Sequence, residues 1–125
     1  MRAREQKESL SVLLVEEHPF RNRLYRGYIT ALGCVVLPFG ERALADAREV
    51  YSLALLSIPE DISTHARYRA LLDALPASVP CIALSVGTLP ELFSNCTKLV
   101  RYFNRSDTNP GEFVDALRFV VGQRA

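Results

Sequence analysis

Five short runs of apolar residues recur along the chain, and each is followed by a segment whose apolar residues are spaced as on a helix. The runs that we predict to be strands cover residues 10–15, 34–37, 53–56, 80–84 and 99–103. A strand that is apolar at nearly every position needs cover on both faces, which is typical of parallel sheets. The pattern therefore predicts an α/β fold in which a five-stranded parallel sheet lies between two layers of helices.

The segments that follow these runs indicate the helices. They cover residues 19–32, 41–50, 62–75, 89–96 and 110–122. The first begins at Pro19, which suits a first helical turn, and its expected inward residues stand at steps of four: Phe20, Leu24, Tyr28 and Leu32. Because crossovers between parallel strands are right-handed, the simplest topology is a doubly wound, flavodoxin-like (βα)5 sheet with three α/β/α layers.

Length, charge and composition limit the function classes. The 125 residues fit one domain, which we expect over residues 10–125 behind a flexible arm of residues 1–9. A net charge of +1 gives no field that would attract nucleic acid, and no apolar run reaches the roughly 20 residues of a membrane span. The polar N-terminus lacks the apolar core of a signal peptide, so we expect a cytoplasmic protein. The three cysteines lack metal-ligand spacing, and no cofactor is indicated.

Polar side chains stand where four of the predicted strands end. Glu16 and Glu17 close the first strand, and Ser57 closes the third. Ser85 ends the fourth strand, and Arg105 follows the fifth. Ligands of doubly wound sheets bind outside the carboxyl ends of the strands, so we expect these five residues to gather into one site.

These strand ends resemble the phosphoacceptor site of bacterial two-component receiver domains, the CheY-like family, over roughly residues 10–123. The resemblance is carried by the segments VEEHPFRNRL, LALLSIPE, IALSVG and RYFNRS, in that order along the chain. In that family, an acidic pair and an acceptor Asp bind Mg²⁺, the Asp accepts a phosphoryl group from a phosphohistidine, and a Ser or Thr and a Lys bind the phosphoryl oxygens. Here Ser57 stands in place of the Asp, and Arg105 stands in place of the Lys.

The replacement by Ser57 removes what this chemistry needs. A neutral hydroxyl is a weak nucleophile without a base, and it brings no charge to a metal. Glu16 and Glu17 alone should bind Mg²⁺ weakly at most, because Mg²⁺ demands near-octahedral oxygen geometry. We therefore expect a degenerate receiver that is not an enzyme. With the Asp absent, we also expect an ion pair between Arg105 and one of the two glutamates.

Two further features concern signalling. Tyr102 matches the switch aromatic of receivers, which turns inward on activation in that family; a half-buried structural tyrosine is the alternative. The last predicted helix is apolar over more of its circumference than one sheet face requires, which indicates a second contact surface. Its predicted interface residues, for a homodimer or another protein partner, are Phe113, Leu117, Phe119 and Val121. The alternative is that neighbouring parts of the chain cover the surplus.

The resemblance implies signal transduction, and the missing acceptor favours binding that does not depend on phosphorylation. We expect a protein partner in a signalling pathway, with or without an output domain in a longer chain. One alternative is a working phosphoreceiver whose acceptor is displaced to Asp61 or Glu60. The other is a regulatory module that binds a nucleotide such as cyclic di-GMP, for which Arg21, Arg23 and Arg26 on the first helix offer positive charge.

Overall fold

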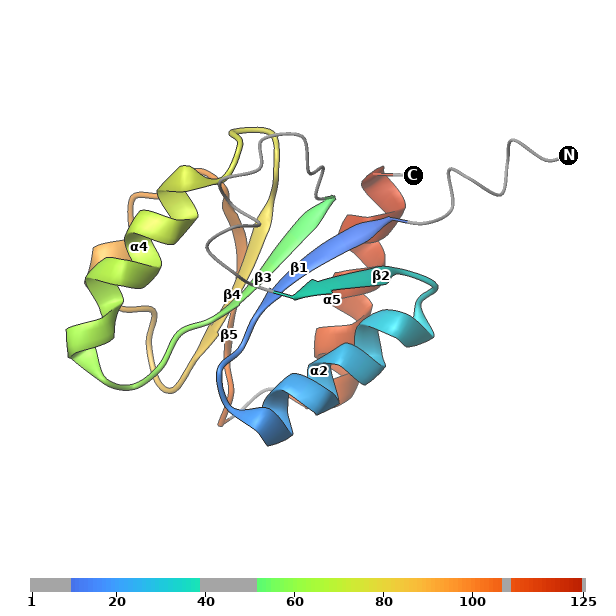
Figure 1. The fold of residues 1–125 in the computed structure, drawn as a ribbon, viewed down its shortest axis with the longest axis horizontal. Coiled ribbons are helices and arrows are strands. Elements are labelled where there is room, and N and C mark those ends of the chain that lie inside the picture. Colours follow the sequence, from blue (N-terminus) through green and yellow to red (C-terminus); the bar gives the residue numbers. More distant parts are fainter. Residues whose placement is uncertain (1–9, 39–51, 107–108, 125) are drawn as a thin grey trace, which may run out of the picture.

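The computed structural model describes residues 10–38, 52–106 and 109–124, and it contains a five-stranded sheet (Figure 1). Neighbouring strands are parallel, and their order across the sheet is β2-β1-β3-β4-β5. The strands are β1 (Ser11–Val15), β2 (Val35–Pro38), β3 (Leu53–Ser57), β4 (Cys81–Ser85) and β5 (Leu99–Asn104). This order confirms the predicted doubly wound topology, and the strand order reverses between β1 and β3.

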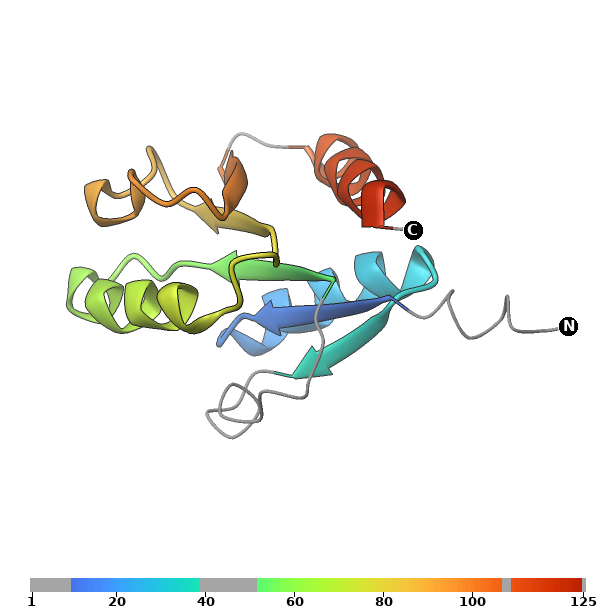
Figure 2. The ribbon, with the colours of Figure 1, turned by 90° about the horizontal axis from the view of Figure 1, so that it is seen from above.

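Helices cover both faces of the sheet (Figure 2). On one face lie α2 (Pro19–Ala31) and α5 (Pro110–Arg124), and on the other lies α4 (His65–Ala74). Two short 3₁₀ turns complete the described elements, η1 (Ile62–Thr64) before α4 and η2 (Glu91–Phe93) before β5. The predicted helix over residues 41–50 and the predicted arm of residues 1–9 lie outside the described residues. Within the described ranges, no helix combines the length and hydropathy needed to cross a bilayer.

The apolar strands contribute side chains to two separate hydrophobic cores, one on each face of the sheet. Val12 and Leu14 of β1 point into the cluster beneath α2 and α5, whereas Leu13 and Val15 point into the cluster beneath α4. All four side chains are almost fully buried. Burying a Val or Leu side chain contributes about 1.5–3 kcal/mol, so an alternating polar strand in this place would lose one of the two cores.

The inward face of α2 differs from the predicted one. Phe20 and Leu24 are 63% and 40% exposed, whereas Tyr25 and Ile29 are buried. A helix has 3.6 residues per turn, so a row at steps of four drifts by about 40° per step. From Phe20 to Leu32 the row therefore turns toward the core, so Phe20 and Leu24 face solvent while Tyr28 and Leu32 pack against the core.

β5 is an edge strand, and the segment that connects β4 to it contains little helix. Between β4 and β5, the described residues 86–98 contain only η2. At the start of β5, Lys98 donates through Nζ to three backbone carbonyls at the C-terminal end of α4, those of Leu72, Asp73 and Leu75. A register shift in the pairing of β4 with β5 leaves Val100 without a partner, as in a β-bulge.

α5 buries part of the predicted interface. Phe113 and Leu117 are 3% and 1% exposed, so their assignment to a partner surface is wrong. The Phe113 ring centroid lies 5.5 Å from that of Tyr25 and 5.7 Å from that of Phe103. The buried residues of α5 are Phe113, Ala116, Leu117 and Val120, and they form the stripe that α5 needs to cover the sheet. Phe119 lies outside this stripe and is 66% exposed, and the side chain of Val121 lies outside the described part of the chain.

Candidate functional site

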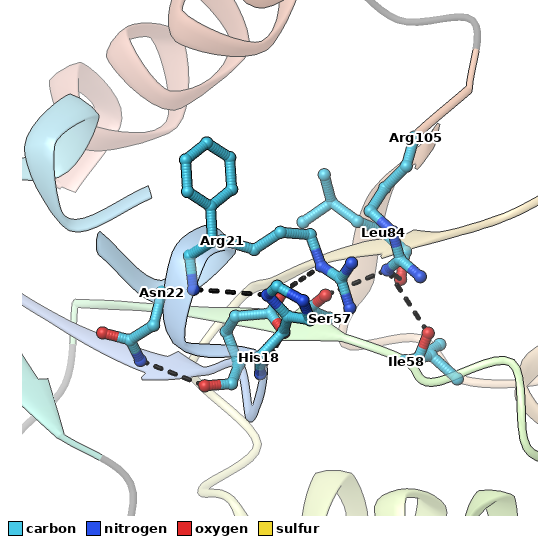
Figure 3. Close-up of polar contacts among 9 residues, drawn as sticks. His18, Arg21, Asn22, Ser57, Ile58, Leu84 and Arg105 are labelled. Carbon is cyan, nitrogen blue, oxygen red and sulfur yellow. Dashed lines mark hydrogen bonds and ion pairs between the residues drawn. The ribbon is translucent and has the colours of Figure 1, made fainter. Parts of the chain in front are cut away.

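Glu16, Ser57 and Ser85 lie at the carboxyl edge of the sheet, at the ends of β1, β3 and β4. Among the described residues, these are the polar side chains that are buried. Arg105 directly follows β5, and its backbone N–H donates to the carbonyl of Ser85 at 2.7 Å. The parallel register therefore brings together the site residues that the sequence predicts, as Figure 3 shows for Ser57 and Arg105.

Glu16 is enclosed by the start of α2. Its Oε1 accepts from Arg21 Nε at 3.1 Å, and its Oε2 accepts from the backbone N–H of His18 at 2.9 Å. The Asn22 amide donates to the Glu16 carbonyl, and only 2% of the Glu16 side chain is exposed. Both carboxylate oxygens thus already have partners from the chain itself.

Glu17 points outward. Its Oε2 pairs with Arg67 Nη2 on α4 at 3.2 Å, and both side chains are more than half exposed. The two glutamates therefore turn to different arginines and share no ligand position. Nowhere in the described residues do three or more His, Cys, Asp or Glu side chains form a group that could hold a metal ion.

Arg105 binds Ser57 and not a glutamate. Its Nη1 donates to Ser57 Oγ at 2.9 Å, to the Ile58 carbonyl at 3.3 Å and to the Leu84 carbonyl at 3.4 Å (Figure 3). The expected ion pair between Arg105 and Glu16 or Glu17 is therefore wrong. Arg21 lies in the first turns of α2, only five residues after Glu16, and can therefore reach its carboxylate. Arg105 instead donates to neutral oxygens at the neighbouring ends of β3 and β4.

Tyr102 points inward and is hydrogen-bonded. The Tyr102 hydroxyl donates to the carbonyl of Gly87. The Ser85 hydroxyl lies 2.8 Å from the Tyr102 hydroxyl oxygen. Gly87 has a φ of +83°, a conformation that favours glycine, and its N–H donates to the side chain of Asn104. The loop after β4 is therefore fastened to β5 through Tyr102 and Asn104.

The alternative acceptors lie apart from this cluster. Asp61 is exposed and caps η1, where its carboxylate accepts from the backbone N–H and the hydroxyl of Ser63. These hydrogen bonds lower the pKa of Asp61. Glu60 is also exposed. Neither residue contacts Ser57 or Arg105, so the structure does not favour a displaced acceptor.

Two buried tyrosines flank the carboxyl edge of the sheet. Burial raises the pKa of Tyr25, and the negative charge of Glu16 adds to this effect. Burial likewise raises the pKa of Tyr68, with a further contribution from Glu17. Both phenols are therefore protonated at neutral pH and supply no negative charge for a metal.

A larger groove lies at the edge of the sheet, between β5 and α5. This β5–α5 groove has a volume of about 790 Å³. Val100, Arg101, Tyr102 and Phe103 line it from β5, and Glu112, Asp115, Ala116, Phe119 and Val120 line it from α5. Tyr102 thus lines the groove with its ring and reaches Ser85 with its hydroxyl, which connects the groove to the strand-end site.

A smaller cavity of about 420 Å³ adjoins the start of α2. It is lined by Glu16, Glu17, Pro19, Asn22, Arg23 and Arg26. Both signs of charge line its wall, which does not resemble the uniformly positive surface that a cyclic dinucleotide would need. The nucleotide-binding alternative stays a prediction without support from this cavity.

Sequence reasoning missed the two arginines that occupy the acidic pair. The sequence suggests Arg21 only as positive charge for a bound nucleotide, and it suggests no role for Arg67. The signal for Arg21 was its spacing from Glu16, because a residue in the first turn of a helix lies close to the strand end that precedes it. No comparable local signal exists for Arg67, which lies 50 residues from Glu17 along the chain.

Comparison with known proteins rests on structure alone. No protein-family profile matches the sequence, and no curated protein resembles it closely enough to count as a match. The receiver domain of a sensor histidine kinase from Pseudomonas aeruginosa, solved with a magnesium ion coordinated in its active-site cleft, matches with a TM-score of 0.67. It is 21% identical, and the match covers 91% of this chain and 98% of that one. The fold is that of a receiver domain.

Other receiver domains match similarly. A CheY-like response regulator from Mesorhizobium loti is 19% identical with a TM-score of 0.66, and the match covers 90% of this chain and 98% of that one. The N-terminal domain of a response regulator/sensory box/GGDEF three-domain protein from Carboxydothermus hydrogenoformans is 17% identical with a TM-score of 0.61, covering 91% and 92%.

Proposed function

We propose that this chain is a receiver-fold signalling domain that acts by binding another protein and does not accept a phosphoryl group. The observation that carries the proposal is the contact between Ser57 and Arg105. Ser57, the residue at the acceptor position, carries a neutral hydroxyl. Its oxygen accepts a hydrogen bond from Arg105 Nη1 at 2.9 Å. A hydroxyl without an adjacent base is a weak nucleophile, and a phosphoryl group on serine would be an ordinary ester instead of an acyl phosphate.

The acidic pair supports the same proposal. Mg²⁺ releases water reluctantly and needs several oxygen ligands in octahedral geometry. Glu16 is held by Arg21 and by a backbone N–H, and Glu17 is directed toward Arg67. A metal would have to break the buried Glu16–Arg21 pair and would find no third carboxylate at Ser57.

The test is exposure to small phosphodonors. We expect no gain of a phosphoryl mass after incubation with acetyl phosphate and Mg²⁺, and no change in tyrosine fluorescence with beryllofluoride and Mg²⁺. A receiver that carries the acceptor Asp, treated in parallel, shows that the reagents work. A hydroxylamine-labile phosphoryl adduct on this chain would overturn the proposal.

The surface that we propose for protein contact is the β5–α5 groove, and the partner we propose is a second copy of this chain. Phe119 and Val100 expose 66% and 48% of their surface at the groove. The two walls carry opposite charge, with Arg101 on β5 and Glu112 and Asp115 on α5. A two-fold axis brings each wall against the opposite wall of the other copy, so one set of contacts forms twice.

The oligomeric state tests this contact. We expect a concentration-dependent dimer in sedimentation velocity and at least a tenfold weaker dimer for Phe119→Asp, because a charge replaces the apolar contact. Phe20→Asp is a matched control, since Phe20 is 63% exposed on α2 and away from the groove. Arg101→Glu should weaken the dimer, and adding Glu112→Arg should restore it. A chain that stays monomeric at all concentrations would contradict the homodimer and leave the phosphodonor result unaffected.

We also propose a cytoplasmic signalling pathway as the setting, with no catalytic activity of the domain itself. One structural neighbour is the first of three domains in its protein. By analogy, we propose that this domain passes its signal to an output domain in a longer chain. Chemical-shift mapping on the domain with an output domain added in trans tests this, and an unchanged spectrum would contradict it.

A further inference from the structure

We propose that Cys81 and Cys96 form a redox modification site, in which a small disulfide oxidises the two thiols to one reversible intramolecular disulfide. All three cysteines of the chain are free thiols in the structure. Cys81 begins β4, and Cys96 lies in the segment that leads into β5, so the site is at the amino edge of the sheet, opposite the strand-end residues. The inference does not depend on the dimer, on phosphorylation or on any signalling partner.

The first argument is that the backbones of the two cysteines converge on one turn. Cys81 is paired with Leu99 in the register of β4 and β5, and its N–H donates to the Lys98 carbonyl at 2.8 Å. Cys96 lies at the other end of the turn, where its carbonyl accepts from the N–H of Leu99 at 3.2 Å. Paired strands are about 4.8 Å apart and a four-residue turn spans less than about 7 Å, so both cysteines are close neighbours of Leu99.

The second argument is that the two side chains enter the same hydrophobic core. Cys81 is completely buried in the cluster beneath α4, and Cys96 packs against that cluster. Burial raises the pKa of Cys81, and the Cys96 thiol adds to this effect, so the two sulfur groups lie within electrostatic range of each other. Cys34 belongs to the cluster on the other face of the sheet. A disulfide requires neighbouring backbones and converging side chains, and of the three possible pairs only Cys81 and Cys96 offer both.

The two thiols differ in their access to solvent, which sets the order of the reaction. Cys96 is partly exposed and can be reached by a dissolved disulfide such as oxidised glutathione, whereas Cys81 cannot. The Cys96 thiolate attacks the oxidant, forms a mixed disulfide and releases one reduced glutathione. The Cys81 thiolate then attacks the Cys96 sulfur and releases the second glutathione. Two protein thiols thus lose two electrons and two protons, and the disulfide of the oxidant is reduced to two thiols.

The surroundings of Cys81 make the second step the slower one. The pKa of Cys81 is raised to about 12, mainly by burial, so its thiolate is scarce at neutral pH. The positive charge of Lys98 acts in the opposite direction, and three carbonyls at the end of α4 hold its ammonium in place. Thr97 and Lys98 also line the β5–α5 groove. A disulfide between β4 and this turn therefore fixes the backbone at one end of that groove.

The experiment is oxidation of the intact, reduced chain with oxidised glutathione, followed by alkylation of the remaining thiols under denaturing conditions and mass spectrometry. We expect one alkylated thiol, that of Cys34, and the loss of two hydrogens elsewhere. Cleavage after Glu91, which lies between the two cysteines, should leave their fragments joined until a reductant is added. Closing this loop should raise the midpoint of thermal unfolding by roughly 5–10 °C. A lower midpoint would show that the bond distorts the native turn and would overturn the site.

Variants assign the bond to this pair. Cys96→Ser should slow the loss of the Cys81 thiol at least about tenfold, because Cys81 then lacks the neighbour through which the oxidant reaches it. Cys34→Ala is the matched control and should oxidise like the unaltered chain, since Cys34 lies in the other core. If a variant does not fold, the joined fragments of the unaltered chain still identify the linked cysteines. Three free thiols after oxidation, a bond that includes Cys34, or a lasting glutathione adduct on Cys96 beside a free Cys81 would refute the site.

Discussion

Arg105, directly after β5, donates through Nη1 to the hydroxyl of Ser57 at the end of β3, across 2.9 Å. β4 lies between these strands, and its Leu84 carbonyl accepts from the same nitrogen at 3.4 Å. One side-chain nitrogen therefore joins the carboxyl ends of three neighbouring strands. A position where the resembling family needs a reactive carboxylate is here occupied by a structural contact.

This contact should be measurable as coupling between the two residues. Arg105→Ala should lower the free energy of unfolding by about 1–2 kcal/mol, because it removes the charged donor to the buried Ser57 hydroxyl. In a double-mutant cycle with Ser57→Ala, urea denaturation should give a coupling energy of about 0.5–1.5 kcal/mol. Arg67→Ala is the comparison, and it should cost less than about 0.5 kcal/mol because its ion pair is exposed. Additive effects of the two substitutions would contradict a stabilising contact between Arg105 and Ser57.

The acidic pair should divide into one structural and one dispensable residue. Glu16→Gln should destabilise the fold by about 1–3 kcal/mol, because the buried carboxylate accepts from both Arg21 and a backbone N–H. Glu17→Gln should change the unfolding free energy by less than about 0.5 kcal/mol, since its pair with Arg67 is solvated. Chemical denaturation of the two variants compares them directly. Equal losses would mean that burial does not distinguish the two carboxylates.

Strand positions could be predicted from the sequence because a strand that is buried on both faces is a short, nearly continuous run of apolar residues. Each of β1, β3 and β4 is apolar at almost every position, and no other common arrangement demands this. Helix faces were harder to predict. On α2 the row from Phe20 to Leu32 matches a step of four but not the true helical repeat, so Phe20 was assigned to the wrong side. On α5 the core stripe and the surplus residue could be separated only when Phe113 was seen packing against Tyr25 and Phe103.

The candidate site shows a similar limit. The strand-end residues were predicted together because parallel topology forces their main chains to one edge. The pairing of each arginine with an acid depends on how far the side chains reach, over a few ångströms. The sequence alone does not indicate these distances. Arg21 was closer to Glu16 than Arg105 was, and the expected pairing with Arg105 failed for that reason.

Tyr102 should stabilise the loop after β4 through its hydroxyl. Tyr102→Phe keeps the ring in the β5–α5 groove but leaves the Gly87 carbonyl and the Ser85 hydroxyl without this partner. The expected loss is about 1 kcal/mol in the free energy of unfolding, with faster amide exchange at residues 86–88. Tyr28→Phe is a control, because the described contacts of Tyr28 are ring contacts. Unchanged exchange in Tyr102→Phe would show that the loop is held by Asn104 instead.

The thiol of Cys81 should make stability fall at alkaline pH. Burial raises the pKa of Cys81 from an ordinary value of 9.0 to about 12. As the pH rises through 9, the thiol of the unfolded chain loses its proton while the folded chain keeps it, so the free energy of the unfolded state falls relative to that of the folded state. The contribution of this thiol to stability is therefore complete below pH 9 and is lost progressively up to pH 12.

Variants without the thiol isolate this effect from the buried phenols, which shift in the same direction. Cys81→Ala and Cys81→Val both lack the ionising group, and Val also keeps most of the side-chain volume. Between about pH 9 and 11, the unaltered chain should lose up to about 1.4 kcal/mol per pH unit more than either variant. Urea denaturation across this range measures the difference. Parallel pH profiles for all three chains would show that the Cys81 thiol ionises alike in the folded and unfolded states, in conflict with its complete burial beside Ile82 and Ala83.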